Sequence, residues 1–505
     1  MPGAAVHLRG GAFDATAGGA GTLPRSWARH FARAGDRPAL ADERGATLSY
    51  GALDTASRSA AGRLHGAGLR AGDRVLVSAA ASLDLAIAHV ACLRLGLVVV
   101  PANTAYRAAE LAHLVADARP RAAICDAPER GGDLRAADPE LRVLAPALAL
   151  PDAEPPPLDA APPEAPALIG YTSGTTGRPK GAVLSHANLL ASAESLRIAW
   201  RWCAGDRLVL ALPLFHMHGL GVGLHGTLHA GASAVLVPQF HPDAVARAIL
   251  RAEATLFFGV PTMYHRMLEF GNAGALRALR LCVSGSAALP ADLHAAFERA
   301  CGQRILERYG MTETVMLISN PVDGERRPGT VGLPLPGVEV RLSGTPPQIE
   351  VRGPNVFRGY WERRDANAEA FTADGWFRTG DLGELDDAGY LRITGRAKEL
   401  IISGGYNVYP REVEDALRAH PAVLDAAIVG TPSPEWGELV TAYVVIGAVD
   451  RSHPPDLAEL RKFLADRLAP YKQPRLLHIV ESLPRNALGK VQKHRLRDGH
   501  VEPDG

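Results

Sequence analysis

The 505-residue chain has few features of a secreted or nucleic-acid-binding protein. Its five cysteines are odd in number and far apart, with no Cys-x-x-Cys pair, which argues against a disulfide framework and a zinc cluster. Lysine plus arginine total 54 and aspartate plus glutamate also total 54, so no excess of positive charge favours nucleic acid. We therefore expect a globular protein of a reducing compartment, the cytoplasm, that binds no nucleic acid.

The chain also lacks an uninterrupted apolar run of about 20 residues, the length that a membrane-spanning helix needs. Its longest apolar stretches, 85–100 and 208–223, contain arginine or histidine, so we expect buried elements and no membrane span. No basic segment followed by an apolar run marks a signal peptide at the N-terminus. Glycine and alanine in residues 1–22 predict a flexible tail.

Lysine is scarce as well, because only six of the 54 basic residues are lysines and the other 48 are arginines. An ammonium is a compact donor on a flexible stem, and a planar guanidinium does not replace it where a point charge is needed. The retained lysines are therefore candidates for specific chemistry. They are Lys180, Lys398, Lys462, Lys472, Lys490 and Lys493.

Periodicity divides the chain into two parts. Short apolar segments alternate with helical stretches over 47–282, which predicts parallel sheets with helices on both faces. Segments punctuated by glycine and proline over 332–390 predict a small β-region. We expect an α/β protein with doubly wound sheets and this β-region in an N-terminal domain, 23–395, and a smaller, mobile α+β domain, 396–505.

The strongest chemical signal is YTSGTTGRPKG, residues 171–181. Its glycines let backbone amides converge, its hydroxyls add donors and Lys180 adds a cation, so it predicts a cradle for polyphosphate. It is not a Walker A loop, because Pro179 precedes the lysine and Gly181 follows it. The cradle residues are Thr172, Ser173, Gly174, Thr175, Thr176, Gly177 and Lys180.

Four further motifs follow in order: YGMTE at 309–313, TGD at 379–381, GRAK at 395–398 with SGGY at 403–406, and PRNALGK at 484–490. Together the five motifs resemble the signature of the adenylate-forming superfamily of acyl-CoA synthetases, adenylation domains and beetle luciferases, over about residues 40 to 495. The resemblance implies ATP, Mg²⁺ and coenzyme A. It also implies that a carboxylate attacks the α-phosphate of ATP and that a thiol then displaces AMP.

The resemblance assigns roles around the nucleotide. It places Thr312 at the α-phosphate, Glu313 on Mg²⁺, and Asp381 and Arg396 at the ribose hydroxyls. Carboxylate oxygens suit both a hard cation and a vicinal diol. Further nucleotide contacts are implied for Ser284, Gly285, Ser286, Tyr309, Gly310 and Met311.

In the same family the small C-terminal domain turns between the two half-reactions. Lys490 is then the catalytic cation that touches both the attacking carboxylate and the α-phosphate, and Lys398 is the hinge. Gly404 and Gly405 are presented to the pantetheine arm of coenzyme A, where glycines permit a thin tunnel wall.

Four residues point to the acid that is activated. The resemblance implies that His216 gates the acyl pocket and that His218 touches the substrate. It also places Arg266 and Arg308 in segments that shape this pocket. Two arginines are costly to desolvate without an anion, and a dicarboxylic acid supplies one. With PLFHMHGL, VSGSAALP and ERYGMTET, these residues resemble the malonyl-CoA synthetase branch, which takes malonate and often methylmalonate.

Other functions remain open at this point. A medium-chain or aryl acid–CoA ligase is favoured if Arg266 faces solvent, and a carrier protein acting in trans is less favoured as acceptor than coenzyme A. From other classes, a P-loop kinase or NTPase is disfavoured by the missing Gly-Lys-Ser/Thr. A catalytically silent adenylate-binding protein is disfavoured by intact Glu313, Asp381, Lys398 and Lys490. The sequence gives no indication of oligomeric state.

Overall fold

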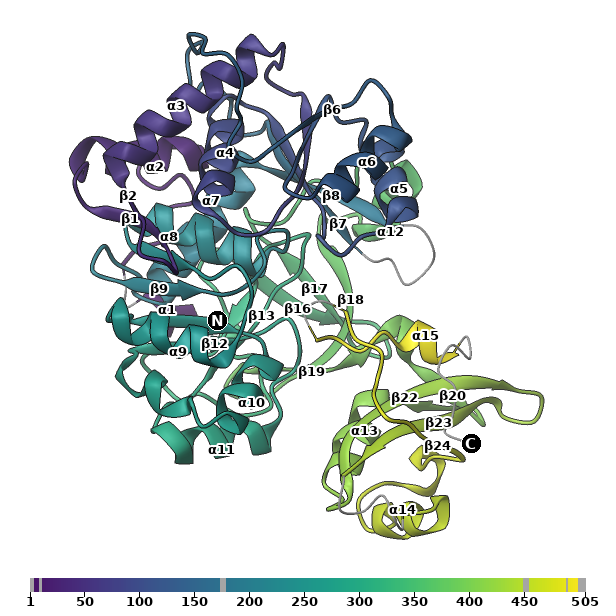
Figure 1. The fold of residues 1–505 in the computed structure, drawn as a ribbon. Coiled ribbons are helices and arrows are strands. Elements are labelled where there is room, and N and C mark those ends of the chain that lie inside the picture. The colour runs from purple at the N-terminus through teal and green to yellow at the C-terminus, as the bar shows by residue number, and fades with distance from the viewer. Residues whose placement is uncertain (1–3, 9–10, 173–178, 448–453, 487–488, 498–505) are drawn as a thin grey trace. The chain divides into compact units, whose positions relative to one another are not determined.

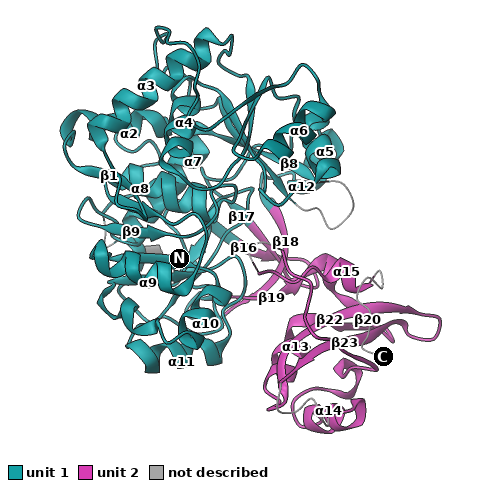
Figure 2. Ribbon diagram, viewed as in Figure 1, with its two compact units in different colours: residues 1–340, 351–377, 386–391 teal, residues 341–350, 378–385, 392–505 magenta. Residues whose placement is uncertain are grey.

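The computed structural model describes residues 4–8, 11–172, 179–447, 454–486 and 489–497, and the chain forms two compact units (Figure 2). Unit 1 comprises Met1–Val340, Val351–Phe377 and Asp386–Leu391, and unit 2 comprises Arg341–Glu350, Arg378–Leu385 and Arg392–Gly505. The expected α/β class, with a large sheet-rich part and a smaller α+β part, is confirmed.

Unit 1 contains a nine-stranded sheet of order β15-β14-β13-β12-β11-β9-β10-β1-β2. All pairs from β13 to β1 are parallel, as expected for strand–helix alternation, and the three pairs at the two ends are antiparallel. The strands are β1 Pro38–Asp42, β2 Thr47–Ser49, β9 Arg207–Leu210, β10 Ser233–Leu236, β11 Leu256–Gly259, β12 Leu281–Ser284, β13 Leu306–Tyr309, β14 Ile318–Ser319 and β15 Leu333–Pro334.

A second sheet of unit 1 has six strands in the order β6-β5-β3-β4-β7-β8. Only the β7–β8 hairpin is antiparallel, and this hairpin flanks the predicted phosphate cradle. The strands are β3 Arg74–Ser78, β4 Val98–Pro101, β5 Ala122–Cys125, β6 Arg142–Leu144, β7 Pro166–Thr172 and β8 Lys180–Ser185.

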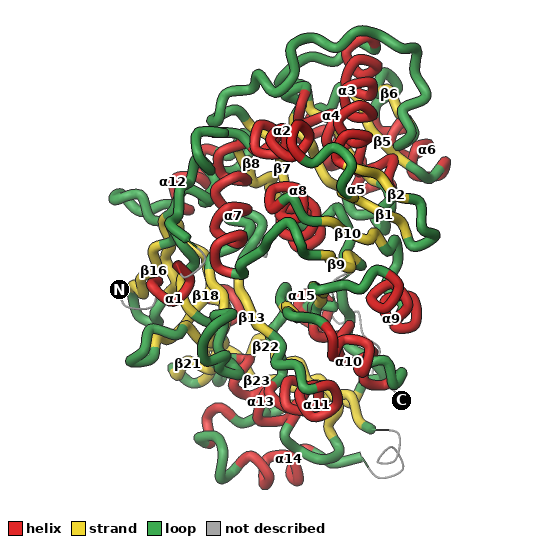
Figure 3. The backbone as a smooth tube through the Cα atoms, turned by 90° about the vertical axis from the view of Figure 1, so that its left-hand side faces the viewer, coloured by secondary structure: helices red, strands yellow, loops and turns green. Residues whose placement is uncertain are grey.

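Helices cover both faces of the nine-stranded sheet. Neighbouring residues of a strand point to opposite faces, and on β11 Phe257 packs on Tyr264 of helix α10 while Phe258 packs on Trp200 at the end of α7. Helices α9, α10 and α11 lie together in Figures 1 and 3 and share one apolar core with the sheet. The helices of unit 1 are α1 Ala4–His7, α2 Leu23–Arg33, α3 Tyr50–Gly66, α4 Leu83–Arg94, α5 Ala108–Ala118, α6 Pro128–Ala137, α7 His186–Ala199, α8 His225–Ala230, α9 Pro242–Arg251, α10 Pro261–Glu269, α11 Ala291–Cys301 and α12 Arg364–Ala370.

Unit 2 is built around a five-stranded sheet of order β21-β20-β23-β22, with β24 beside β23. Its core is formed by this sheet and two helices, α13 Pro410–Arg418 and α14 Leu457–Leu464, and α15 Lys493–Arg497 follows near the end of the chain. A separate four-stranded sheet has the order β16-β17-β18-β19, and its residues are divided between the units. The strands are β16 Glu339–Ser343, β17 Gln348–Arg352, β18 Phe377–Leu385, β19 Leu391–Arg396, β20 Ile401–Ser403, β21 Tyr406–Val408, β22 Val423–Ser433, β23 Gly437–Ile446 and β24 Leu476–Ile479.

The N-terminal segment differs from the expected flexible tail. His7 is buried, and its Nε2 lies 3.4 Å from the carbonyl oxygen of Leu333. The ring of Phe13 packs against the backbone of Gly337. The prediction of a flexible tail rested on the glycine and alanine content of the segment. Composition carries no information about such distant contacts. Among the described helices, none combines the length and apolar character that a bilayer crossing requires.

Candidate active site

Two predicted nucleotide-binding segments meet at one edge of the nine-stranded sheet. Strands β12 and β13 are parallel, with Ser284 paired to Glu307, so both end at the same edge. The segment 284–286 continues from β12 and the segment 309–313 continues from β13. Ligands of open α/β sheets bind beyond the carboxyl ends of the strands, which makes this edge the candidate site.

The hairpin of the phosphate cradle reaches the same site. Thr172 and Lys180 are paired across β7 and β8. A Cβ atom at Gly170 would lie 2.4 Å from Cγ2 of Thr312, so the side chain of Thr312 rests directly on the backbone of β7. The other cradle residues, Ser173, Gly174, Thr175, Thr176 and Gly177, lie outside the described residues.

A tyrosine that the sequence analysis did not identify joins two predicted site residues. The ammonium of Lys180 lies 5.5 Å from the centre of the Tyr360 ring. The Tyr360 hydroxyl donates a hydrogen bond of 3.0 Å to Oε1 of Glu313, which is 4 % exposed. Tyr360 therefore links the cation of the cradle to the predicted Mg²⁺ ligand. Its segment, FRGYW, follows no acid, base or phosphate pattern, so the sequence offered no signal for it.

Arg308 lies buried next to this edge. Its side chain is 5 % exposed, and in the described part of the chain its Nε and Nη2 atoms have no hydrogen-bond partner. Burial lowers the pKa of the guanidinium to about 9. A buried cation without a counter-charge is costly, so the site is complementary to an anion.

The two predicted pocket histidines lie near Arg308. Burial, and then the charge of Arg308, lower the pKa of His216 to about 4 and hold that of His218 well below its usual value. The backbone nitrogen of His218 donates to Nδ1 of His216 over 3.2 Å, and Nδ1 of His218 lies 3.3 Å from the Ser286 hydroxyl. Both imidazoles are therefore neutral at pH 7 and add no positive charge to the pocket.

Arg266 has different surroundings. Its guanidinium lies over the rings of Phe240 and Phe270, 5.3 and 5.7 Å from their centres. Within the described residues no hydrogen bond or ion pair joins it to Arg308 or to the histidines. The structure thus brings Arg308, His216 and His218 together and holds Arg266 in a separate aromatic contact.

In unit 2 the two predicted ribose residues form an ion pair. Nε of Arg396 lies 2.8 Å from Oδ1 of the buried Asp381. The backbone nitrogen of Asp381 donates to the hydroxyl of Thr379 over 3.1 Å, within strand β18.

Lys490 belongs to the same cluster of unit 2. Desolvation by the surrounding chain, and then the charge of Arg396, lower the pKa of the Lys490 ammonium. The charges of Asp381 and Glu399 act in the opposite direction. Lys490 is nevertheless exposed, so its ammonium is only partly desolvated and stays in contact with water. Lys398, the predicted hinge, lies exposed in a short 3₁₀ turn, Ala397–Glu399.

Another of the scarce lysines anchors the loop that carries Lys490. The Lys493 ammonium lies 2.7 Å from Oε1 of Glu414 and 3.2 Å from Oε2 of Glu399. Asn486 accepts a hydrogen bond of 2.9 Å from the backbone nitrogen of Lys490. The scarcity of lysine marked Lys493 as a candidate for specific chemistry. It did not predict that Lys493 forms ion pairs with these two glutamates.

The two glycines predicted at the pantetheine tunnel form the turn between β20 and β21. Gly404 and Gly405 have φ angles of +58° and +83°, which side chains rarely adopt. A Cβ atom at Gly404 would lie 2.9 Å from the Trp436 ring. Glycine is therefore required at this turn by conformation and by space.

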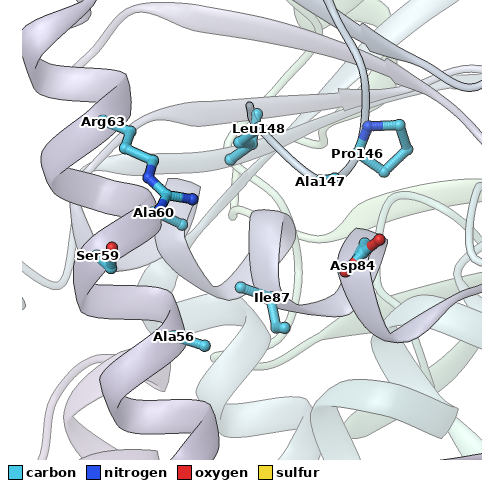
Figure 4. A pocket seen from close by; sticks show the side chains of 9 residues that line it. All are labelled: Ala56, Ser59, Ala60, Arg63, Asp84, Ile87, Pro146, Ala147 and Leu148. Carbon is cyan, nitrogen blue, oxygen red and sulfur yellow. The ribbon is translucent and has the colours of Figure 1, made fainter. Parts of the chain in front are cut away.

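A pocket elsewhere in unit 1 contains none of the predicted site residues. This pocket has a volume of about 260 Å³. In Figure 4 its lining side chains come from α3, from α4 and from residues 146–148. Its charged side chain on α3, Arg63, is already bonded to Asp152 at 2.8 Å. Its lining residues are Ala56, Ser59, Ala60, Arg63, Asp84, Ile87, Pro146, Ala147 and Leu148.

Comparisons with known proteins identify the family. The family model described as AMP-binding enzyme matches residues 27–361, and the AMP-binding enzyme C-terminal domain matches residues 412–490. The chain is 41 % identical to the mitochondrial malonate–CoA ligase of Mus musculus over 65 % of this chain and 64 % of that one. It thus spans less than two thirds of that relative's length.

Two other relatives match almost end to end. The sulfoacetate–CoA ligase of Cupriavidus necator is 38 % identical, with 91 % of this chain and 94 % of that one covered. The crystal structure of ATP-bound MatB from Rhodopseudomonas palustris has a TM-score of 0.89 and 39 % identity, with 95 % of this chain and 99 % of that one covered. On the family match and these relatives, the chain belongs to the AMP-binding enzyme family.

Proposed function

We propose that the chain is an ATP-dependent carboxylic acid–CoA ligase with malonate as its preferred acid. A carboxylate oxygen of the acid attacks the α-phosphorus of ATP and pyrophosphate leaves. The thiol of coenzyme A then attacks the acyl carbon of the adenylate, loses its proton to solvent, and AMP leaves. The ordered motifs, the family membership and relatives named malonate–CoA ligases support this reaction.

The single observation that carries the choice of acid is the buried guanidinium of Arg308. Two of its nitrogen atoms lack a described partner, and its neighbours His216 and His218 are neutral. Malonate can offer one carboxylate to ATP and the other to this guanidinium. An acid with an apolar end would leave the arginine unpaired at a cost of about 3–5 kcal/mol, which corresponds to a preference of hundreds-fold or more.

Each unit by itself contains residues proposed for the adenylation step. In unit 1, Thr172, Lys180 and Thr312 are proposed to bind the phosphates, with the cradle residues between 173 and 177. Glu313 fits an Mg²⁺ ion, because Mg²⁺ is usually held by one or two carboxylates together with substrate phosphates. When bound, Mg²⁺ offsets the negative charge that gathers on the phosphates.

In unit 2, Asp381 and Arg396 are proposed to bind the ribose hydroxyls and Lys490 to contact the carboxylate and the α-phosphate. Lys398 is the proposed hinge, and Gly404 with Gly405 the proposed contact of the pantetheine arm. The remaining nucleotide contacts proposed from unit 1 are Ser284, Gly285, Ser286, Tyr309, Gly310 and Met311.

A second candidate acid follows from the same arginine. A guanidinium pairs with a sulfonate as well as with a carboxylate, and sulfoacetate carries a sulfonate where malonate carries its second carboxylate. The sulfoacetate–CoA ligase of Cupriavidus necator is matched over 94 % of its length. Methylmalonate is a third candidate, since it keeps both carboxylates.

An acid panel tests the proposal. The purified chain is incubated with ATP, Mg²⁺, coenzyme A and malonate, methylmalonate, sulfoacetate, succinate, acetate, butyrate, octanoate or ferulate, and AMP and the thioester are quantified. We expect AMP in equal amount to the thioester, with malonate giving the highest kcat/KM. ADP as product would indicate a kinase or NTPase, and a preference for octanoate or ferulate would favour the medium-chain or aryl acid alternative.

We also propose coenzyme A as the physiological acceptor and the cytoplasm as the compartment. A carrier protein acting in trans is the less favoured acceptor, and replacing coenzyme A by such a carrier in the same assay compares the two. A reducing compartment suits the five cysteines, all of which are free thiols. Fractionation of the cells that make the protein tests the location.

A further inference from the structure

The chain makes a strained three-residue turn directly after Glu313. The backbone nitrogen of Met316 donates to the carbonyl of Thr314 over 2.7 Å, and Val315 between them has a φ of +59°. Such a turn with positive φ is rare and strained, and a β-branched side chain is disfavoured in this region. The surrounding structure must therefore hold Val315 in this conformation.

The side chain of Asn355 holds both sides of the turn. Its Nδ2 atom donates to the carbonyl of Thr314 at 3.0 Å and to that of Met316 at 2.6 Å. Asn355 is 2 % exposed, so water cannot readily replace its hydrogen bonds to these two carbonyls. Because one amide bridges both carbonyls that flank Val315, the turn cannot open without breaking two buried hydrogen bonds.

Asn355 is held in turn by a second asparagine in the same way. Nδ2 of Asn188 donates to the carbonyls of Pro354 and Val356 at 2.7 and 3.0 Å, the two that flank Asn355. Asn188 belongs to the capping box at the start of α7, which follows the strand that begins at Lys180. Two bridging amides thus connect the cradle hairpin with the turn after Glu313.

The segment after Asn355 also fixes Glu313 itself. The backbone nitrogen of Phe357 donates to the carbonyl of Glu313 over 2.8 Å, and Tyr360 donates to its carboxylate over 3.0 Å. We propose that Asn355 is a positioning residue: by holding Val315 in its left-handed conformation, it fixes the carboxylate of Glu313 for the Mg²⁺ ion that accompanies ATP. This inference rests on the proposed function.

The first test replaces Asn355 with alanine and measures the Mg²⁺ concentration that half-saturates malonate-dependent ATP–pyrophosphate exchange. We expect this midpoint to rise about 10-fold, the lower end of the effect of removing a direct partner of a metal ligand, because Asn355 acts on Glu313 through the turn. Asn320→Ala is the matched control, because Asn320 is equally buried and bridges the carbonyls of Glu307 and Thr330 at 3.1 and 2.8 Å. It should lower the unfolding temperature and leave the Mg²⁺ midpoint within about 2-fold.

The second test is a rescue that a merely structural role would not produce. Glycine adopts the φ of residue 315 without a clash. In a Val315→Gly background the hydrogen bonds of Asn355 are therefore no longer needed to hold a strained residue in place. Asn355→Ala should then raise the Mg²⁺ midpoint by no more than about 3-fold relative to Val315→Gly alone. An equal rise in both backgrounds, or a similar rise in Asn320→Ala, would overturn the proposal.

Two further measurements keep the outcomes distinct. If Asn355→Ala alone does not fold, we expect the double variant with Val315→Gly to fold, and its failure to do so contradicts the proposal. Calorimetric titration of ATP into each variant at several Mg²⁺ concentrations reads the same midpoint without an acid. A wild-type protein that binds Mg²⁺-ATP but forms no AMP with any acid would refute the proposed function and leave the role of Asn355 to be decided by this titration.

Discussion

A Cβ atom at Gly285 would lie 2.4 Å from the guanidinium carbon of Arg308 and 2.8 Å from its Nη1. The bare backbone of Gly285 therefore provides the space in which the guanidinium lies. This explains how a large cation fits beside the end of β12 while it remains buried. Gly285 thus allows Arg308 to take this position in the proposed acyl pocket.

Gly285→Ala should displace Arg308 from its present position. We expect KM for malonate to rise by about 10-fold or more, since a misplaced charge partner loses more than 1.4 kcal/mol. Gly274→Ala is the matched control, because a Cβ atom there meets no other atom within 4 Å. Steady-state kinetics with each substrate varied in turn measures the effect, and an unchanged KM for malonate would argue against this account of the pocket.

Arg308→Met and Arg266→Met separate the two arginines that the sequence placed at the acyl pocket. Loss of the Arg308 charge should reduce kcat/KM for malonate by hundreds-fold, at about 3–5 kcal/mol, and raise the preference for butyrate relative to malonate. Arg266 already stacks on Phe240 and Phe270, so Arg266→Met should change this ratio by less than about 5-fold, within 1 kcal/mol. If Arg266→Met alone shifts the ratio, the distal carboxylate binds at Arg266.

Lys490→Ala tests the division between the half-reactions. The ammonium is proposed to act on the carboxylate and the α-phosphate, so we expect adenylate formation to fall by about 100-fold or more while thiolysis of supplied malonyl-adenylate is preserved. Single-turnover assays of each half measure this. An equal loss in both halves would contradict the proposed role of Lys490.

Acid should destabilise unit 1 through its buried histidines. Nε2 of His89 lies 2.7 Å from Nε2 of His225, and burial lowers the pKa of His89 to about 4 and that of His225 well below its usual value. A histidine of the unfolded chain takes up its proton near pH 6.5, whereas the buried His89 of the folded chain does so only near pH 4. The stability is therefore fully present above pH 6.5 and is lost as the pH falls toward 4, by about 3 kcal/mol for His89.

Urea unfolding at several pH values measures this loss. His89→Gln should make the free energy of unfolding less dependent on pH between 6.5 and 4, whereas substitution of the exposed His265 serves as the control. A pH dependence that is the same in His89→Gln and wild type would show that the buried pair does not cause the acid instability.

The sequence predicted what local patterns encode. The parallel sheets and the small β-region that follows them were predicted from apolar periodicity and turn residues. The strand order did not, since the position of β1 between β10 and β2 depends on pairing between residues nearly 200 positions apart.

The same limit applies to the site. Arg266 and Arg308 were equivalent in the sequence, because the phase of a short helix does not show that Arg266 stacks on Phe240. Tyr360 and Asn355 follow no motif. Their importance arises from contacts with Glu313, Thr314 and Met316, some 40 residues earlier in the chain. Residues of ordinary type that act through distant partners become visible only in the fold.

The most direct measurement of the central claim follows the oxygen atoms. Malonate labelled with ¹⁸O in its carboxylates is converted with ATP and coenzyme A, and the products are analysed by mass spectrometry. If the carboxylate attacks the α-phosphorus, AMP retains one labelled oxygen and pyrophosphate contains none. Label in inorganic phosphate together with ADP, or unlabelled AMP formed alongside malonyl-CoA, would contradict the adenylation chemistry proposed for this site.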